Sequence, residues 1–322
     1  MKRRFLYWPT LMIVASLLLV AGLAGCQNET SNKGKHAAAN STKSEGTRIV
    51  KDAFGEVEIP KKPKRVAAIY MEDYLKALGV DPVVQWYHPS WGKQDYLKLT
   101  APEFDVTGNI EALLAQKPDL IIVDGAVDAA KYKQYSKVAP TYRLPEEILD
   151  DPMKITKTIG DLLGESKKAD EVMKQYQTKV AQTKAALKKA IGNQTVAVVR
   201  LNIGENTLAL FGTKNNYIGN IYHELGLTPP PMAKNMKDFQ EILSEEALPQ
   251  LGADHIILFP SNGYWDSKEN KASIEFLENS MWQSVPAVKK GNVHIVDRTY
   301  WQSGAITANK LKMDDLMKMF VK

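Results

Sequence analysis

The side chains best suited to chemistry are aromatic and basic residues in loops that follow apolar runs of the chain. Residues 86–93 hold two tryptophans, a tyrosine, a histidine and a lysine. Large aromatic side chains in loops need a reason, because exposing them is unfavourable. Combined with Arg and Lys, they suit a bulky, partly apolar, anionic ligand. The candidate ligand contacts are Tyr70, Trp86, Tyr87, His88, Lys93, Arg200, Asn202, Tyr217, Trp265, Arg298 and Trp301.

Several of these residues also have a purely structural explanation. Trp86 could pack at a sheet edge, Tyr217 could belong to the core, and a lone loop histidine such as His88 is more often solvated. Arg200 differs because it ends an apolar run, where an unpaired buried charge would be costly. It therefore needs an anionic partner, which is either a protein carboxylate or the ligand.

Catalytic motifs are missing from the sequence. It contains no G-x-S-x-G, no P-loop and no G-x-G-x-x-G after a strand, and its five histidines lack metal-ligand spacing. Receptors for bare zinc or manganese need convergent histidines and carboxylates, whereas aromatic and cationic residues dominate these loops. We therefore expect no enzyme activity, no cofactor and no metal bound directly by the protein.

The only cysteine, Cys26, closes a segment with the layout of an export signal. Residues 2–4 are basic and residues 11–24 form an apolar stretch too short to span a bilayer comfortably. Small residues then lead to the cysteine, and this arrangement resembles the bacterial lipobox. The alternative is a stray cysteine after an uncleaved anchor. We expect residues 1–25 to be a lipoprotein signal peptide, with Cys26 lipidated at the extracytoplasmic face of the cell membrane.

The segment after the signal is polar, and we expect residues 26–47 to form a flexible tether. Asn, Ser, Thr, Lys and Ala dominate it, so it cannot bury enough apolar area to offset the entropy of ordering. The net charge of +5 includes three positive residues of the signal. The remaining charge is too small to indicate a nucleic-acid partner.

Alternating short strands and helices predict two α/β lobes with parallel sheets. The first begins with a hairpin at 48–59 that turns at Gly55. One pattern occurs at 109–122 and again at 244–257. In each copy a capped helix with an early Glu is followed by an Asp and a buried strand. Predicted strands lie at 65–70, 82–86, 120–123, 195–201, 255–259 and 292–296, and predicted helices at 71–78, 109–116, 151–164, from 166 onward, 218–225 and 311–320.

Five phrases together resemble one family, the substrate-binding proteins of ABC importers for siderophores and vitamin B12. They are PKRV at 63–66, KPDLI at 117–121, LGL at 225–227, ADHI at 253–256 and AVKKGNV at 287–293. The resemblance implies a class III periplasmic-binding-protein fold, in which a single long backbone helix joins two Rossmann-like lobes. We place the first lobe at 48–150, the connecting helix at 151–164 and the second lobe at 165–322.

The same resemblance implies a monomeric receptor that holds an iron(III)-siderophore between its lobes and presents it to an ABC permease with its cytoplasmic ATPase. Haem or cobalamin binding is the alternative. Glu111 and Glu246 match the glutamates that dock on the permease, although complementing a helix dipole would also explain them. Lys93 resembles a ligand-contacting lysine of catecholate binders. Asn202 replaces a second arginine of some relatives, which argues against a highly charged tricatecholate.

Overall fold

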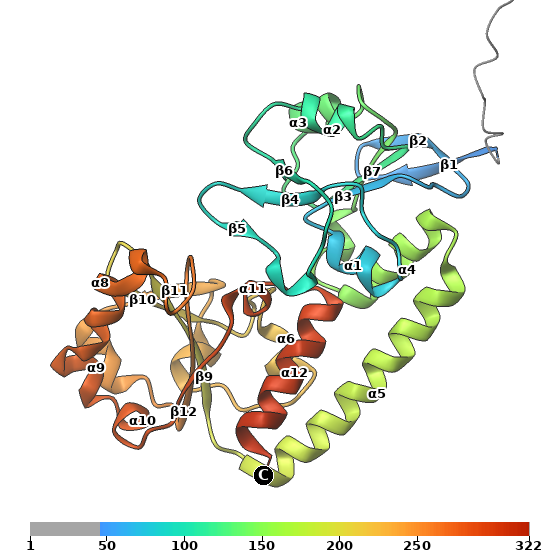
Figure 1. Cartoon of the computed structure of the whole chain (residues 1–322). Helices are drawn as coiled ribbons and strands as arrows, with labels where there is room; N and C mark the ends of the chain where they lie inside the picture. Colours follow the sequence, from blue (N-terminus) through green and yellow to red (C-terminus); the bar gives the residue numbers. More distant parts are fainter. Residues whose placement is uncertain (1–45, 322) are drawn as a thin grey trace, which may run out of the picture. The chain divides into compact units, whose positions relative to one another are not determined.

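The computed structural model describes residues 46–321, which are coloured by sequence in Figure 1. The predicted signal peptide, Cys26 and nearly all of the predicted tether lie outside the described residues. Within residues 46–321, no helix is long and apolar enough to cross a membrane.

The first lobe opens with the predicted hairpin. β1 (Thr47–Asp52) pairs antiparallel with β2 (Gly55–Pro60). The turn is held by the Asp52 carboxylate, whose Oδ1 accepts the backbone N–H groups of Phe54 at 2.7 Å and Gly55 at 2.9 Å. Gly55 has φ +139°, a conformation that side-chain-bearing residues rarely adopt, so the glycine permits this tight turn.

The sheet of the first lobe consists of two three-stranded groups, ordered β3-β7-β8 and β5-β4-β6. All neighbours are parallel except β4 and β5. The groups meet where the Val83 N–H donates to the Val66 carbonyl at 2.9 Å. β4 begins three residues after the predicted start at 82. The strands are β3 (Val66–Ile69), β4 (Gln85–His88), β5 (Gly92–Lys93), β6 (Glu103–Asp105), β7 (Leu120–Val123) and β8 (Thr141–Arg143).

Both faces of this sheet are covered, because β3 and β7 are buried along their whole length, as their continuous apolar runs predict. The predicted helix at 71–78 is shorter in the structure, and Gly79 ends it in a left-handed conformation at φ +78°. The helices of this lobe are α1 (Glu72–Ala77), α2 (Glu111–Ala115) and α3 (Ala129–Tyr135), with 3-10 turns η1 (Asp95–Leu97) and η2 (Glu146–Ile148).

The second lobe contains a five-stranded mixed sheet ordered β11-β10-β9-β12-β13. β9, β12 and β13 are parallel, as predicted, whereas the antiparallel strands β10 and β11 were not predicted. The strands are β9 (Val196–Asn202), β10 (Thr207–Phe211), β11 (Gln240–Leu243), β12 (His255–Pro260) and β13 (Val293–Ile295).

The closing helix of the second lobe, α12 (Ile306–Phe320), begins five residues before its predicted start. The helix expected from residue 244 onward is instead a 3-10 helix, η3 (Glu245–Gln250), with Pro249 inside it. The other helices are α6 (Gly219–His223), α7 (Pro231–Asn235), α8 (Lys271–Glu275), α9 (Ser280–Ser284), α10 (Pro286–Lys289) and α11 (Arg298–Trp301), with 3-10 turns η4 (Lys268–Asn270) and η5 (Phe276–Glu278).

Two consecutive helices connect the lobes. α4 (Pro152–Leu163) matches the helix predicted at 151–164, and it packs against α1 and α5. α5 (Ser166–Ile191) is 26 residues long, or about 39 Å, and packs against α12. Figure 1 shows α5 running from α4 to the far end of α12. Of these two helices α5 is the longer, and the placement of the connecting helix at 151–164 remains a prediction. The residue bounds of the two lobes remain a prediction.

One apolar core continues through both lobes. It includes Val66 and Leu75 of the first lobe, Ile159 of α4, and Val198 and Met313 of the second lobe. Helices α4, α5 and α12 carry this cluster across the boundary. Continuous packing of this kind favours small movements between the lobes over wide opening.

A buried carboxylate also joins the lobes where α12 begins. Asp73 on α1 accepts the backbone N–H groups of Thr307 at 2.8 Å and Ala308 at 3.0 Å, and the Tyr96 hydroxyl at 2.8 Å. Ala305, at the N-cap of α12, has no polar side chain that could accept the free backbone N–H groups of the first turn. Asp73 of the first lobe therefore supplies the cap for a helix of the second.

Candidate ligand-binding site

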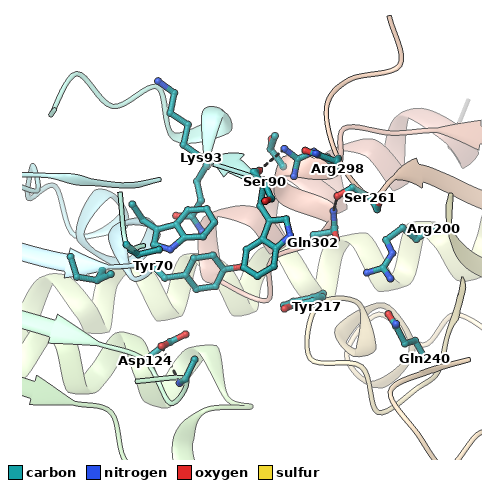
Figure 2. A pocket seen from close by; sticks show the side chains of 18 of the residues that line it. Tyr70, Ser90, Lys93, Asp124, Arg200, Tyr217, Gln240, Ser261, Arg298 and Gln302 are labelled. Carbon is teal, nitrogen blue, oxygen red and sulfur yellow. Dashed lines mark hydrogen bonds between the residues drawn. The ribbon is translucent and has the colours of Figure 1, made fainter. Parts of the chain in front are cut away.

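A cavity of about 1100 Å³ lies between the two lobes. Its walls come from residues at the carboxyl ends of parallel strands, where open α/β sheets collect ligands. Tyr70 follows β3, Asp124 follows β7 and Ser261 follows β12. Figure 2 shows Tyr70, Lys93 and Asp124 on one side of this space and Arg200, Gln240 and Ser261 on the other.

The structure brings seven of the predicted contact residues together on the cavity wall. The first lobe contributes three and the second lobe four. They are Tyr70, Trp86, Lys93, Arg200, Asn202, Tyr217 and Arg298. Their role as ligand contacts remains a prediction, but their common location follows the rule for strand ends that selected them.

Two tryptophans from the prediction do not reach the cavity. Trp301 is 0% exposed, and its indole N–H donates to Asp315 Oδ2 on α12 at 2.8 Å. Trp265 packs against the apolar cluster of the second lobe and donates to the Val296 carbonyl at 3.3 Å. Both indoles are occupied in internal packing, so their assignment as ligand contacts is corrected.

Tyr87 and His88 also lie off the cavity wall. Tyr87 is paired with Lys93 and Asp105 in neighbouring strands, and strand alternation directs it away from the face of Trp86. His88 stacks on Trp91, with ring centroids 3.9 Å apart, and its Nδ1 accepts the Ser90 N–H at 3.1 Å. His88 therefore supports an aromatic wall rather than lining the cavity itself.

That aromatic wall consists of packed rings from the first lobe. Tyr70 meets Trp86 edge-on at 4.9 Å, and Trp86 lies 6.4 Å from His88, which carries Trp91. The backbone N–H of Trp86 donates to the buried carboxyl of Glu72 at 2.5 Å, which fixes the strand at this point. Trp91 lines the cavity and is 56% exposed, so it offers a free apolar surface to a ligand.

Tyr70 has an unusual backbone. Its φ of +64° places a bulky residue in the left-handed region, at a cost of about 1–3 kcal/mol. Burial raises the pKa of the Tyr70 hydroxyl, and a side-chain hydrogen bond with Tyr217 contributes in the same direction. This strained backbone aims the phenol from the first lobe toward a tyrosine of the second.

The cationic side chains of the cavity differ in how many hydrogen bonds and ion pairs they already form with the protein. Lys93 forms an ion pair with Glu103 at 2.7 Å, and this hydrogen bond raises the pKa of Lys93. Arg298 donates to the Gly263 carbonyl at 3.0 Å and, across the lobes, to the Trp91 carbonyl at 2.8 Å. Both are therefore engaged with the protein.

Arg200, like Arg298 and Lys131, has no carboxylate partner among residues 46–321, and unlike them it makes no hydrogen bond to a backbone carbonyl there. Its Nε donates to Asn202 Oδ1 at 2.9 Å, and its guanidinium lies 5.4 Å from the centre of the Phe211 ring. Among residues 46–321, no ion pair within 4.0 Å involves Arg200. Burial lowers its pKa. The charge of Glu205 acts on Arg200 without an ion pair between them, and a ligand as the anionic partner of Arg200 remains a prediction.

Sequence reasoning missed several wall residues. Asp124 directly follows β7, so the rule for strand ends could have found it. Phe239, Gln240 and Ile242 come from β11 and the residue before it, which carry no clear strand pattern. Within the described part of the chain, no group of three or more His, Cys, Asp or Glu residues could hold a metal ion.

Two α/β lobes with a long connecting helix and a cavity between their strand ends define a class III periplasmic-binding-protein fold. The chain matches the sequence profile of the periplasmic binding protein family over residues 70–300 and belongs to that family. These proteins are substrate-binding components of transporters.

Similar curated proteins come from Bacillus subtilis. The iron(3+)-hydroxamate-binding protein FhuD is 31% identical over 294 residues, which cover 88% of this chain and 88% of FhuD. The probable siderophore-binding lipoprotein YfiY is 29% identical, with coverage of 97% and 98%. Among solved structures, Staphylococcus aureus SirA complexed with staphyloferrin B has a TM-score of 0.70 at 27% identity, with coverage of 85% and 98%.

Proposed function

We propose that the protein is a lipid-anchored receptor that binds a ferric siderophore between its lobes and delivers it to an ABC permease. The observation that carries the proposal is the cavity of about 1100 Å³, with its aromatic wall and the unpaired Arg200. A ferric siderophore shields its metal inside organic arms and presents anionic oxygens, so it matches both features. Relatives named for iron(3+)-hydroxamate and siderophore binding support this ligand class.

The charges of the wall favour a chelate of low net charge. Four cations and three carboxylates line the cavity: Lys93, Lys131, Arg200 and Arg298, against Asp124, Asp128 and Glu205. A nearly neutral wall suits a hydroxamate or citrate-type complex better than a strongly anionic tricatecholate. The relatives described above are named for iron and siderophores rather than for haem or cobalamin, which supports the siderophore over those alternatives.

Delivery requires a surface that the permease can recognise. Glu111 is exposed at the start of α2, and Glu246 is exposed in the first turn of η3. Backbone and Ser244 hydrogen bonds lower the pKa of Glu246, which keeps it charged. We assign both residues to permease docking. The double variant E111A/E246A is expected to bind ligand normally and to abolish uptake by cells, and normal uptake would contradict the assignment.

In this proposal the protein acts as a monomer without catalytic turnover. It binds and releases the chelate unchanged, and lipidation of Cys26 keeps it near the permease. Tethering raises the effective concentration of receptor at the transporter. The substitution C26A is expected to abolish incorporation of labelled fatty acid into the protein, whereas equal labelling of the variant would contradict lipidation at this residue.

The ligand class is tested by titrating the purified protein with a panel of chelates and following tryptophan fluorescence. Trp86 and Trp91 line the cavity, so a bound iron complex should quench them. Ferric trihydroxamate or ferric citrate is expected to bind, and haem, cobalamin and ferric tricatecholate are expected to bind more weakly. Tight binding of haem or cobalamin alone, or of none of these compounds, would refute the proposal.

A further inference from the structure

The two walls of the cavity carry different charge. On the first lobe, Lys93 is matched by Glu103, and the Lys131 ammonium donates to the Val106 carbonyl at 3.1 Å and lies 5.4 Å from the centre of the Tyr135 ring. The second lobe contributes Arg200 and Arg298. With Lys93 neutralised, the carboxylates Asp124 and Asp128 make the first wall the more acidic one.

Only one of these two carboxylates is free to serve a ligand. Asp128 is the N-cap of α3, and its Oδ1 accepts the Lys131 backbone N–H at 2.8 Å. Asp124 has one hydrogen bond among the described residues, from the Ala126 N–H at 3.1 Å. No ion pair of the described residues includes it. Burial raises the pKa of Asp124, as expected for a carboxylate that lacks a matched cation.

The charge of Arg143 acts on Asp124, but the hydrogen bonds of Arg143 go to other groups. Its charge lowers the pKa of Asp124 and thus opposes the effect of burial. Its guanidinium, however, pairs with Glu146 and donates to the carbonyls of Gly125 and Val127. Arg143 therefore stabilises the loop that carries Asp124 and forms no ion pair with the Asp124 carboxylate, which lines the cavity.

The surroundings of Asp124 suit a positively charged group. The Tyr70 and Tyr217 hydroxyls lie close enough for the Asp124 charge to raise the pKa of both. The rings of Tyr70 and Trp86 line the same cavity. A carboxylate among aromatic rings is the arrangement that binds a protonated amine, through a charge-assisted hydrogen bond and cation–π attraction. Figure 2 shows Asp124 on the same side of the cavity as Tyr70 and opposite Arg200.

We propose that Asp124 is a specificity-determining residue, which selects ferric chelates that carry a protonated amine apart from the iron centre. The amine would lie against Asp124 on the first lobe, and the anionic chelate oxygens would face Arg200 on the second. A ligand with opposite charges at its two ends is thereby bound in one orientation. This inference rests on the proposed siderophore function.

The test compares two linear ferric trihydroxamates that differ only at one end, where one has a free primary amine and the other an acetylated amine. The wild-type protein is expected to bind the free amine about tenfold or more tightly, as a hydrogen bond between charged groups implies. The substitution D124N keeps the shape of the side chain but removes its charge, and it should abolish this preference. The control E205Q removes a carboxylate from the opposite wall and should retain it.

Equal affinity of the wild-type protein for both chelates would overturn the inference, and so would a preference that persists in D124N. Neither result would affect the siderophore proposal, because both chelates would still bind. Failure of both chelates to bind would instead refute the siderophore function, and the inference with it. Unchanged thermal unfolding of D124N confirms that the comparison is made on folded protein.

Discussion

Replacing Asp73 by alanine tests whether the first lobe caps a helix of the second. The carboxylate accepts the N–H groups of Thr307 and Ala308, at 2.8 and 3.0 Å, and the Tyr96 hydroxyl at 2.8 Å. Asp73 is 0% exposed, so water cannot replace it at these donors without rearrangement. The substitution therefore leaves two backbone donors and one hydroxyl without their acceptor.

The size of the effect follows from those three bonds. A buried donor left unsatisfied costs about 1–3 kcal/mol, so two N–H groups give about 2–6 kcal/mol. Removing the carboxylate also removes the cost of burying it, which is visible in its raised pKa. The expected net loss in free energy of unfolding is about 2–4 kcal/mol, a large part of the total for a typical domain. Y96F removes the bond to Asp73 and a longer one to Ser303 Oγ at 3.5 Å, and it should cost about 1 kcal/mol.

Urea unfolding followed by tryptophan fluorescence measures this loss by linear extrapolation. The matched control is D81A. Asp81 lies near the end of α1 in an exposed ion pair with Lys76 at 3.7 Å, and such pairs contribute little. A loss below about 0.5 kcal/mol for D73A, equal to that of D81A, would refute the capping argument. Hydrogen exchange should also accelerate at Thr307 and Ala308 in D73A.

Four further substitutions test the site and its supports. R200A is expected to weaken binding of an anionic ferric chelate by about 2–5 kcal/mol. K93A should weaken it by less, because Glu103 already neutralises Lys93. Unchanged affinity in R200A would remove this arginine from the site. Burial lowers the pKa of Lys312 to about 7, whereas the pKa of an unfolded lysine is near 10.4. Between these two pH values the unfolded state binds more protons than the native state, so the free energy of unfolding rises with pH. K312M should flatten that rise, and an equal slope in both proteins would contradict the assignment. Burial raises the pKa of Glu72 from 4.5 to about 8. Between pH 4.5 and 8 the native state therefore holds more protons than the unfolded state, and the free energy of unfolding falls as pH rises. E72Q should lack this fall, and an unaltered fall would show that another group is responsible.

Much of the fold could be predicted because buried parallel strands leave a plain pattern. β7 and β12 are continuous apolar runs, and Gly79 and Gly164 both end helices in the left-handed conformation. β11 escaped prediction because it is half exposed and begins with polar residues. Its place in the sheet depends on pairing with β10, which local sequence does not reveal.

The location of the site could be predicted, but the hydrogen-bond partners of its residues could not. The rule for strand ends found Tyr70 and Arg200, and it should also have led to Asp124. Trp301 was misassigned because its partner Asp315 lies on α12, one helix further along the chain. Likewise, the bond from Arg298 to the Trp91 carbonyl joins residues 207 positions apart. Such partners are set by tertiary packing, and no local pattern encodes them.

The Asp73 contact also constrains the order in which the protein can fold. Its two N–H partners lie 234 and 235 residues further along the chain. In an elongating chain, Asp73 of the first lobe therefore cannot bind its backbone partners until the start of α12 has emerged. Because contacts of such long sequence separation form late, the native state is expected to close only once nearly all of the described chain is available. A chain that is exported in an unfolded state would benefit from this delay, because it would stay unfolded, and so able to pass through a translocation channel, until translocation is almost finished.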